Sequence, residues 1–90
     1  MTTIEQIQQR LSKALHPVQI DITDHSAAHA GHAGAVEGGG HYHVRVVSAA
    51  FQGLSLVKRH QLVYQALGDM MKKQIHALGI DALTPEEIAG

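Results

Sequence analysis

The 90-residue sequence has no cysteine, which excludes structural disulfides, Cys-x-x-Cys redox chemistry and thiolate metal ligands from the chain itself. Any metal bound here must be held by histidines and carboxylates, or by thiolates that a partner supplies. The chain does have eight histidines. Because neutral imidazole is a good ligand for zinc, copper, nickel and iron, metal binding stays open as a function.

Aromatic residues are also scarce, at 3% of the chain, so aliphatic side chains must fill the core. A hydrophobic content of 44% suffices for one compact domain, which we expect to span residues 1–90. No apolar run approaches the ~18 residues of a membrane span, and the first residues lack the basic and apolar regions of a signal peptide. We therefore expect a cytoplasmic protein that does not enter a membrane.

The chain has no strong excess of either charge, with seven basic and eight acidic residues. This balance argues against strong non-specific binding of nucleic acid, which normally requires a high pI. Neither a serine-nucleophile motif nor a phosphate-binding glycine motif is present. We therefore expect that the protein is not an enzyme.

The first half of the sequence predicts one helix and two strands. A capping-box pattern at Thr2, followed by apolar residues at helical spacing, predicts a helix that ends before Pro17. Alternating apolar residues predict strands at 18–23 and 41–46, which most simply pair antiparallel. Between them, residues 25–40 are mostly Gly, Ala and His, a composition typical of a long flexible loop.

The second half predicts a long helix, a third strand and a short final helix. Ser55 is a candidate N-cap for a helix from Leu56 to Met71. Its expected apolar stripe consists of Val57, His60, Tyr64, Leu67 and Met71. A strand at 75–80 and a helix starting at Pro85 follow. The order α-β-β-α-β-α predicts an α+β fold in which a three-stranded mixed sheet carries its helices on one face.

Four histidines are candidate metal ligands. His25, His29 and His32 belong to the 25–40 segment, where solvated histidines without a role are the alternative. His76 stands between the long helix and the third strand, where a structural role is common, and by alternation it shares a side with Leu78 and Ile80. Two histidines give two ligands, whereas structural zinc takes about four. A partner, glutathione or water would complete such a site.

Basic residues supply a second set of candidates. Lys58 and Arg59, with Arg45 and Lys72, could form a patch for a partner or nucleic acid, although short charge clusters are usually solvated. His60 lies on the expected apolar stripe, so it is either a structural residue or a contact. The turn and helix at 51–64 superficially resemble a helix-turn-helix.

Several motifs resemble those of the BolA-like proteins. They are the run Phe51–Tyr64, the strand Tyr42–Ser48, and Ile75–Ile80 followed by Thr84-Pro85. The resemblance as a whole covers about residues 4–88, in order and with the expected spacing. The resemblance implies a fold similar to the class II KH fold without its Gly-x-x-Gly nucleic-acid loop.

The resemblance also implies a function. BolA-like proteins partner monothiol (CGFS) glutaredoxins and share a [2Fe-2S] cluster with them, for iron-sulfur trafficking or iron and redox regulation. The glutaredoxin and glutathione supply thiolates, and the BolA-like protein supplies the histidine before the last strand, here His76. In the His-loop subtype the second ligand matches His32, while His29 and His25 could substitute. The isolated protein is then expected to carry no cofactor.

The sequence also permits other functions. Family members are also described as DNA-binding transcription regulators that act in stress response, for which Lys58, Arg59 and His60 would be the contacts. A bare histidine site for zinc, nickel or copper is a third possibility. The sequence does not decide between an apo monomer and an apo homodimer. It also names neither an acceptor of the cluster nor target genes.

Overall fold

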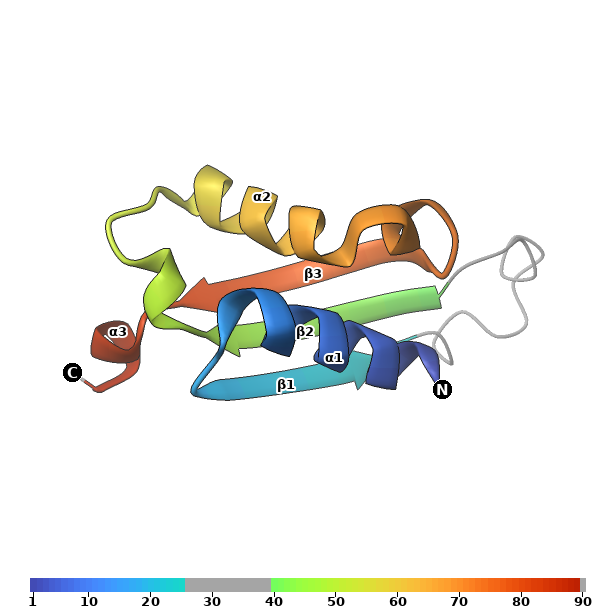
Figure 1. Ribbon diagram of the computed structural model, residues 1–90, viewed down its shortest axis with the longest axis horizontal. Coiled ribbons are helices and arrows are strands. Elements are labelled where there is room, and N and C mark those ends of the chain that lie inside the picture. Colours follow the sequence, from blue (N-terminus) through green and yellow to red (C-terminus); the bar gives the residue numbers. More distant parts are fainter. Residues whose placement is uncertain (26–39, 90) are drawn as a thin grey trace.

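The computed structural model describes residues 1–25 and 40–89, and Figure 1 shows their arrangement. The elements follow in the order α1 (Thr3–Leu15), β1 (Gln19–Asp24), β2 (Gly40–Val47), the 3₁₀ segment η3 (Ala49–Phe51), α2 (Leu56–Leu67), the 3₁₀ segment η4 (Gly68–Lys72), β3 (Ile75–Leu83) and α3 (Pro85–Ala89). This confirms the predicted α-β-β-α-β-α order. None of the helices in these ranges is both long and apolar enough to cross a membrane.

The three strands form one mixed sheet in the order β1-β2-β3. β1 and β2 are antiparallel, with Ile20 opposite Val46, whereas β2 and β3 are parallel, with Val44 opposite Ile80. Because side chains alternate across a strand, these four residues lie on the same face. That face carries the apolar side chains of all three strands, as the sequence predicted.

The core lies between this face of the sheet and the helices α1 and α2, which run side by side (Figure 1). Each of these elements contributes fully buried apolar side chains, which are Ile7 and Leu11 of α1, Leu67 of α2, Phe51 of η3 and Val44 of β2. Full burial of such side chains contributes roughly 1.5–3 kcal/mol each relative to exposure. The prediction that the main helices pack on one face of the sheet is confirmed.

Local capping places the starts of α1 and α2 where the sequence predicted them. The Thr2 hydroxyl accepts a hydrogen bond from the Glu5 amide at 3.1 Å, and the Thr2 amide donates to the Glu5 carboxylate at 2.9 Å. Ser55 caps α2 by accepting from the Lys58 amide at 3.3 Å. Such caps satisfy amides that have no partner within the first turn of a helix.

Two expectations for the long helix are wrong. The α-helix ends at Leu67 rather than Met71, because Gly68 has φ +56° and the chain continues as the 3₁₀ segment η4. The predicted stripe is also rotated, since Val57 and Tyr64 are 66% and 42% exposed. The helix buries Val63 together with Leu67, which the predicted stripe did include. Apolar residues occur on both sides of this helix, so their spacing alone did not fix the buried face.

Candidate functional site

One end of the sheet, which we call the histidine end, contains the end of β1 and the starts of β2 and β3 (Figure 1). Gly40 pairs with Ile75, but His41 pairs with Ala77, so His76 is an extra residue on β3. Such a bulge turns a side chain away from the regular alternation. Ile75 is buried in the core, while His76 is exposed. The expectation that His76 shares a side with Leu78 is therefore wrong, because the bulge changes the alternation.

The bulge brings His76 to a second histidine. The ring centroids of His41 and His76 are 5.1 Å apart, and their planes are tilted by 37°. His41 occupies the same face of β2 as His43, opposite the apolar face. His41 is not among the candidates that the sequence suggests, although its place in the alternating strand is visible there. Its neighbour in space could not be foreseen, because the bulge is not encoded in a simple pattern.

Main-chain hydrogen bonds fix the backbone at the histidine end. The Gly40 amide donates to the Gln74 carbonyl at 2.8 Å, and the His25 amide donates to the His41 carbonyl at 2.7 Å. His25 is thus held beside His41, with an exposed side chain. Within residues 1–25 and 40–89, no three His, Asp or Glu side chains are grouped closely enough to form a metal site.

The predicted ligands His29 and His32 lie outside the described residues. The flanking residues on either side of that segment, His25 and Gly40, both lie at the histidine end, as does His76. The assignment of His32 or His29 as a ligand stays a prediction.

The face of the sheet opposite the core carries a further histidine in an ion pair. His43 Nε2 lies 3.2 Å from the Asp81 carboxylate. The His43 ring lies against Gly79, where an added Cβ would come within 2.9 Å of the ring. Arg45 is exposed on the same face, with Asp21 and Asp81 opposite it on the neighbouring strands. Arg45 therefore points away from α1 and α2.

At the other end of the sheet, Arg59 holds three elements together. Its Nε donates to the Leu54 carbonyl at 3.0 Å, and its NH1 donates to the Ala82 carbonyl at 3.0 Å. The same nitrogen lies 2.7 Å from the Glu87 carboxylate. The side chain of Arg59 is only 11% exposed. The structure thus gives Arg59 a positioning role within the fold, which the sequence-based assignment to a binding surface missed.

Glu87 completes this arrangement. Its carboxylate accepts from Arg59 and from the Thr84 amide at 2.7 Å, while the Glu87 amide donates to the Thr84 hydroxyl at 3.3 Å. The hydrogen bond from Arg59, followed by that from the Thr84 backbone, lowers the pKa of Glu87 to about 2. Its spacing from Thr84 is that of a capping box, a signal visible in the sequence. We call this region, comprising Ser48, Arg59, Thr84 and Glu87, the anchor end.

The remaining cationic candidates do not converge on one patch. Lys58 is exposed near the start of α2, and Lys72 is exposed in η4, beyond the other end of that helix. His60 is half-buried. The segment before α2 is the three-residue η3 followed by a turn at Gly53, with φ +75°. A short 3₁₀ turn and one helix thus replace the two helices of a helix-turn-helix.

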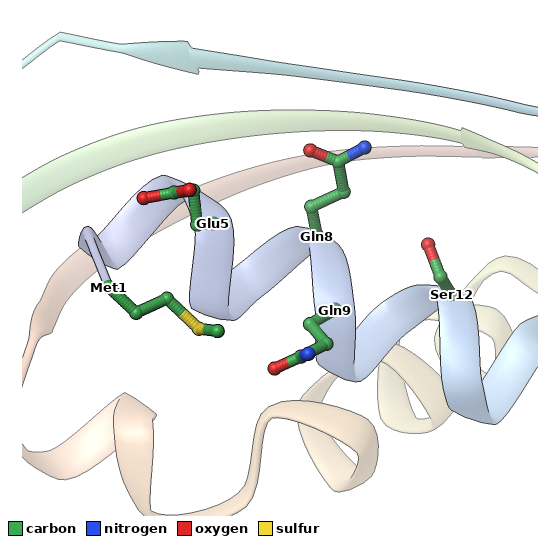
Figure 2. A pocket seen from close by; sticks show the side chains of 5 residues that line it. All are labelled: Met1, Glu5, Gln8, Gln9 and Ser12. Carbon is green, nitrogen blue, oxygen red and sulfur yellow. The ribbon is translucent and has the colours of Figure 1, made fainter.

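A shallow hollow occurs along the outer side of α1. Figure 2 shows the side chains that line it, which are Met1, Glu5, Gln8, Gln9 and Ser12. The carboxylate of Glu5 is already used in the cap, and its hydrogen bonds with the backbone and side chain of Thr2 lower its pKa. All five residues come from one short stretch of chain. This hollow therefore offers neither imidazoles nor converging charges.

Comparison with known proteins gives consistent matches. Residues 11–87 match the family described as "BolA-like protein". The chain is 49% identical over 88 residues to "SufE-like protein 1, chloroplastic/mitochondrial" of Arabidopsis thaliana, covering 91% of this chain and 24% of that protein. It is 35% identical to the "DNA-binding transcriptional regulator BolA" of Haemophilus influenzae, covering 90% of this chain and 76% of that protein. It spans about half the length of several other curated relatives.

A solved structure shares the fold throughout. The BolA domain of SufE1 from Arabidopsis thaliana superposes with a TM-score of 0.83 at 45% identity. The match covers 97% of this chain and 98% of that domain. The sheet and the helices thus belong to a fold that this solved domain shares.

Proposed function

The chain belongs to the BolA-like protein family, and from this we propose that it partners a monothiol glutaredoxin and co-ligates a [2Fe-2S] cluster. The observation that carries the proposal is the bulge in β3. It leaves Ile75 in the core and turns the next residue, His76, outward. An exposed imidazole on a rigid strand is available to a metal centre that a second protein brings.

The chain's donor set fits a cluster that is completed by a partner. The sequence has no cysteine, so the chain cannot surround a cluster with thiolates. The described residues of the histidine end offer imidazole nitrogens instead. Under this proposal the glutaredoxin cysteine and glutathione supply the thiolates. Histidine ligation raises the reduction potential of such a centre relative to thiolate ligation, and it requires deprotonated imidazole.

Under this proposal His76 is the principal ligand, and His32 supplies the second imidazole, with His29 or His25 as substitutes. His25 is held beside His41 at the histidine end, whereas the other two lie outside the described residues. The protein acts as a binding partner and not as an enzyme. The shared cluster is transferred to an acceptor protein or serves in iron sensing, and no reaction on a small substrate is proposed.

The test is anaerobic cluster reconstitution with a monothiol glutaredoxin and glutathione, followed by visible absorption and circular dichroism. Wild type should give a coloured heterocomplex whose spectrum differs from that of the glutaredoxin's own cluster. His76→Ala should lose that spectrum, and His32→Ala should change it. His16→Ala is a matched control, because His16 is an exposed histidine at the C-cap of α1 and is not a candidate ligand or contact. A wild-type chain that leaves the glutaredoxin spectrum unchanged would contradict the proposal.

DNA binding remains a second candidate, favoured by the name of the Haemophilus influenzae relative. Lys58 is then the principal contact, because it is exposed at the start of α2, with His60 beside it. Arg59 would position this helix rather than touch DNA, since its guanidinium is bonded within the fold. Salt-dependent binding of duplex DNA that Lys58→Met weakens would support this function, and no binding at low salt would exclude it.

A further inference from the structure

We infer that His41 and His76 together form a site for one divalent transition-metal ion of the nickel or copper class, which this chain binds without a partner. This site goes beyond the proposed function, because it needs neither a glutaredoxin nor glutathione. It also assigns a ligand, His41, that is fixed on a strand. The remaining coordination positions are taken by water.

The separation of the two rings matches chelation of one ion. A nitrogen ligand lies about 2.0–2.1 Å from such a metal, and the ring centroid lies about 1 Å farther along that line. Two imidazoles in adjacent positions of a square-planar or tetragonal ion would therefore have centroids about 4.5 Å apart, and two at a tetrahedral angle about 5 Å apart. The centroids of His41 and His76 are 5.1 Å apart. Rotation of the side chains can then direct one nitrogen of each ring to a common point without moving the backbone.

The backbone beneath the two rings is held in place. His41 and Ala77 are paired across β2 and β3, and the Gly40 amide donates to the Gln74 carbonyl at 2.8 Å. Binding therefore orders two side chains and no loop, which keeps its entropic cost low. The regular alternation of β3 would have placed His76 on the apolar face, so the bulge is what creates the pair.

The ligand types select the class of ion. Imidazole nitrogen suits zinc, copper, nickel and iron, and affinity for a given site rises toward copper(II). Calcium and magnesium prefer oxygen ligands and are excluded as occupants. His76 is exposed, so an ion can enter from solvent and exchange water for further ligands.

The test is titration of the untagged 90-residue chain with nickel(II). Binding is measured by calorimetry and by paramagnetic broadening of histidine side-chain NMR signals. His41→Ala and His76→Ala should each weaken binding about tenfold or more, since even an outer partner of a metal ligand typically contributes about 10- to 100-fold. Broadening should appear first at His41 and His76.

Two control variants separate this pair from the other histidines. His43→Ala removes the next histidine on the same face, whose ring is engaged by Asp81, and it should keep the wild-type affinity. The double replacement of His29 and His32 by alanine should also keep it. Circular dichroism verifies that each variant is folded.

The inference is overturned if His41→Ala binds nickel(II) as wild type does, if the His29 and His32 double variant loses binding, or if wild type shows no saturable binding. These outcomes are distinct from failure of the proposed function. A chain that binds nickel(II) through His41 and His76 but forms no cluster with a glutaredoxin would refute the proposed function alone.

Discussion

The two ends of the sheet use their polar side chains in opposite ways. At the anchor end, Arg59 and Glu87 bond to each other and to main-chain atoms of the same chain. At the histidine end, the main chain is bonded, but the imidazole of His76 is exposed and lies beside that of His41. The first arrangement stabilises the fold, and the second leaves ligand groups on a rigid support.

This difference changes how the basic motif Lys58-Arg59 is interpreted. In the sequence the two cations are equivalent candidates for a binding surface. In the structure Lys58 is exposed, whereas Arg59 is 11% exposed and joins α2 to β3 and α3. Adjacent residues of the same charge on a helix thus face different environments, because successive positions differ by about 100° around its axis.

The largest expected difference between the two ends is in the free energy of unfolding that is lost when a side chain is replaced. Arg59→Met should lower the free energy of unfolding by about 2–3 kcal/mol, because two main-chain carbonyls lose a charged donor. His76→Ala should change it by less than about 0.5 kcal/mol, as is usual for an exposed residue. Urea denaturation followed by circular dichroism measures both.

Lys58→Met is the matched control for Arg59→Met, because it removes the neighbouring cation from an exposed position of the same helix turn. It should stay within about 0.5 kcal/mol of wild type. Equal losses from the two replacements would mean that the contacts of Arg59 contribute no more than a solvated charge, and the distinction between the two ends would fail.

Much of this fold could be predicted from the sequence, because its signals are local. The caps at Thr2 and Ser55 depend on residues close to them in the sequence. The strands could be predicted from the simple alternation of apolar and polar residues. The long-range contacts of Arg59 were not predictable, since they join residues up to 28 positions apart. The exposure of His76 was not predictable either, because the bulge reverses what alternation implies.

A smaller effect is expected from Ser48, a second member of the anchor end. Its hydroxyl is fully buried, donates to the Leu15 carbonyl at 2.6 Å and accepts from the Ala50 amide at 3.1 Å. Ser48→Ala should lower the free energy of unfolding by about 1–2 kcal/mol, because both partners stay in place without it. Thermal or urea unfolding tests this, with Ser12→Ala at a half-buried position of α1 as a control. A loss no greater than that of Ser12→Ala would contradict a buried, structural hydroxyl.

The smallest effect depends on pH and concerns Glu87. The hydrogen bond from Arg59, followed by that from the Thr84 backbone, lowers the pKa of Glu87 from 4.5 to about 2. A carboxyl group whose pKa is lower in the folded protein stabilises it above the unfolded pKa, and this contribution disappears as pH falls from about 4.5 towards 2. Glu87→Gln should therefore be less stable than wild type at neutral pH and approach it in acid.

The acid measurement also distinguishes the two ends of the sheet. The pKa of Asp69 is likewise lowered, first by its hydrogen bond from Arg10, so wild type loses stability in acid for more than one reason. Only the difference between wild type and Glu87→Gln isolates the anchor end. His76→Ala should follow the wild-type profile between pH 4.5 and 2, because His76 is not a cause of the lowered pKa of Glu5, Asp69 or Glu87, the carboxyl groups so shifted among the described residues. If His76→Ala reduced the loss of stability between pH 4.5 and 2 as Glu87→Gln does, the histidine end would contribute to the same stabilising network as the anchor end.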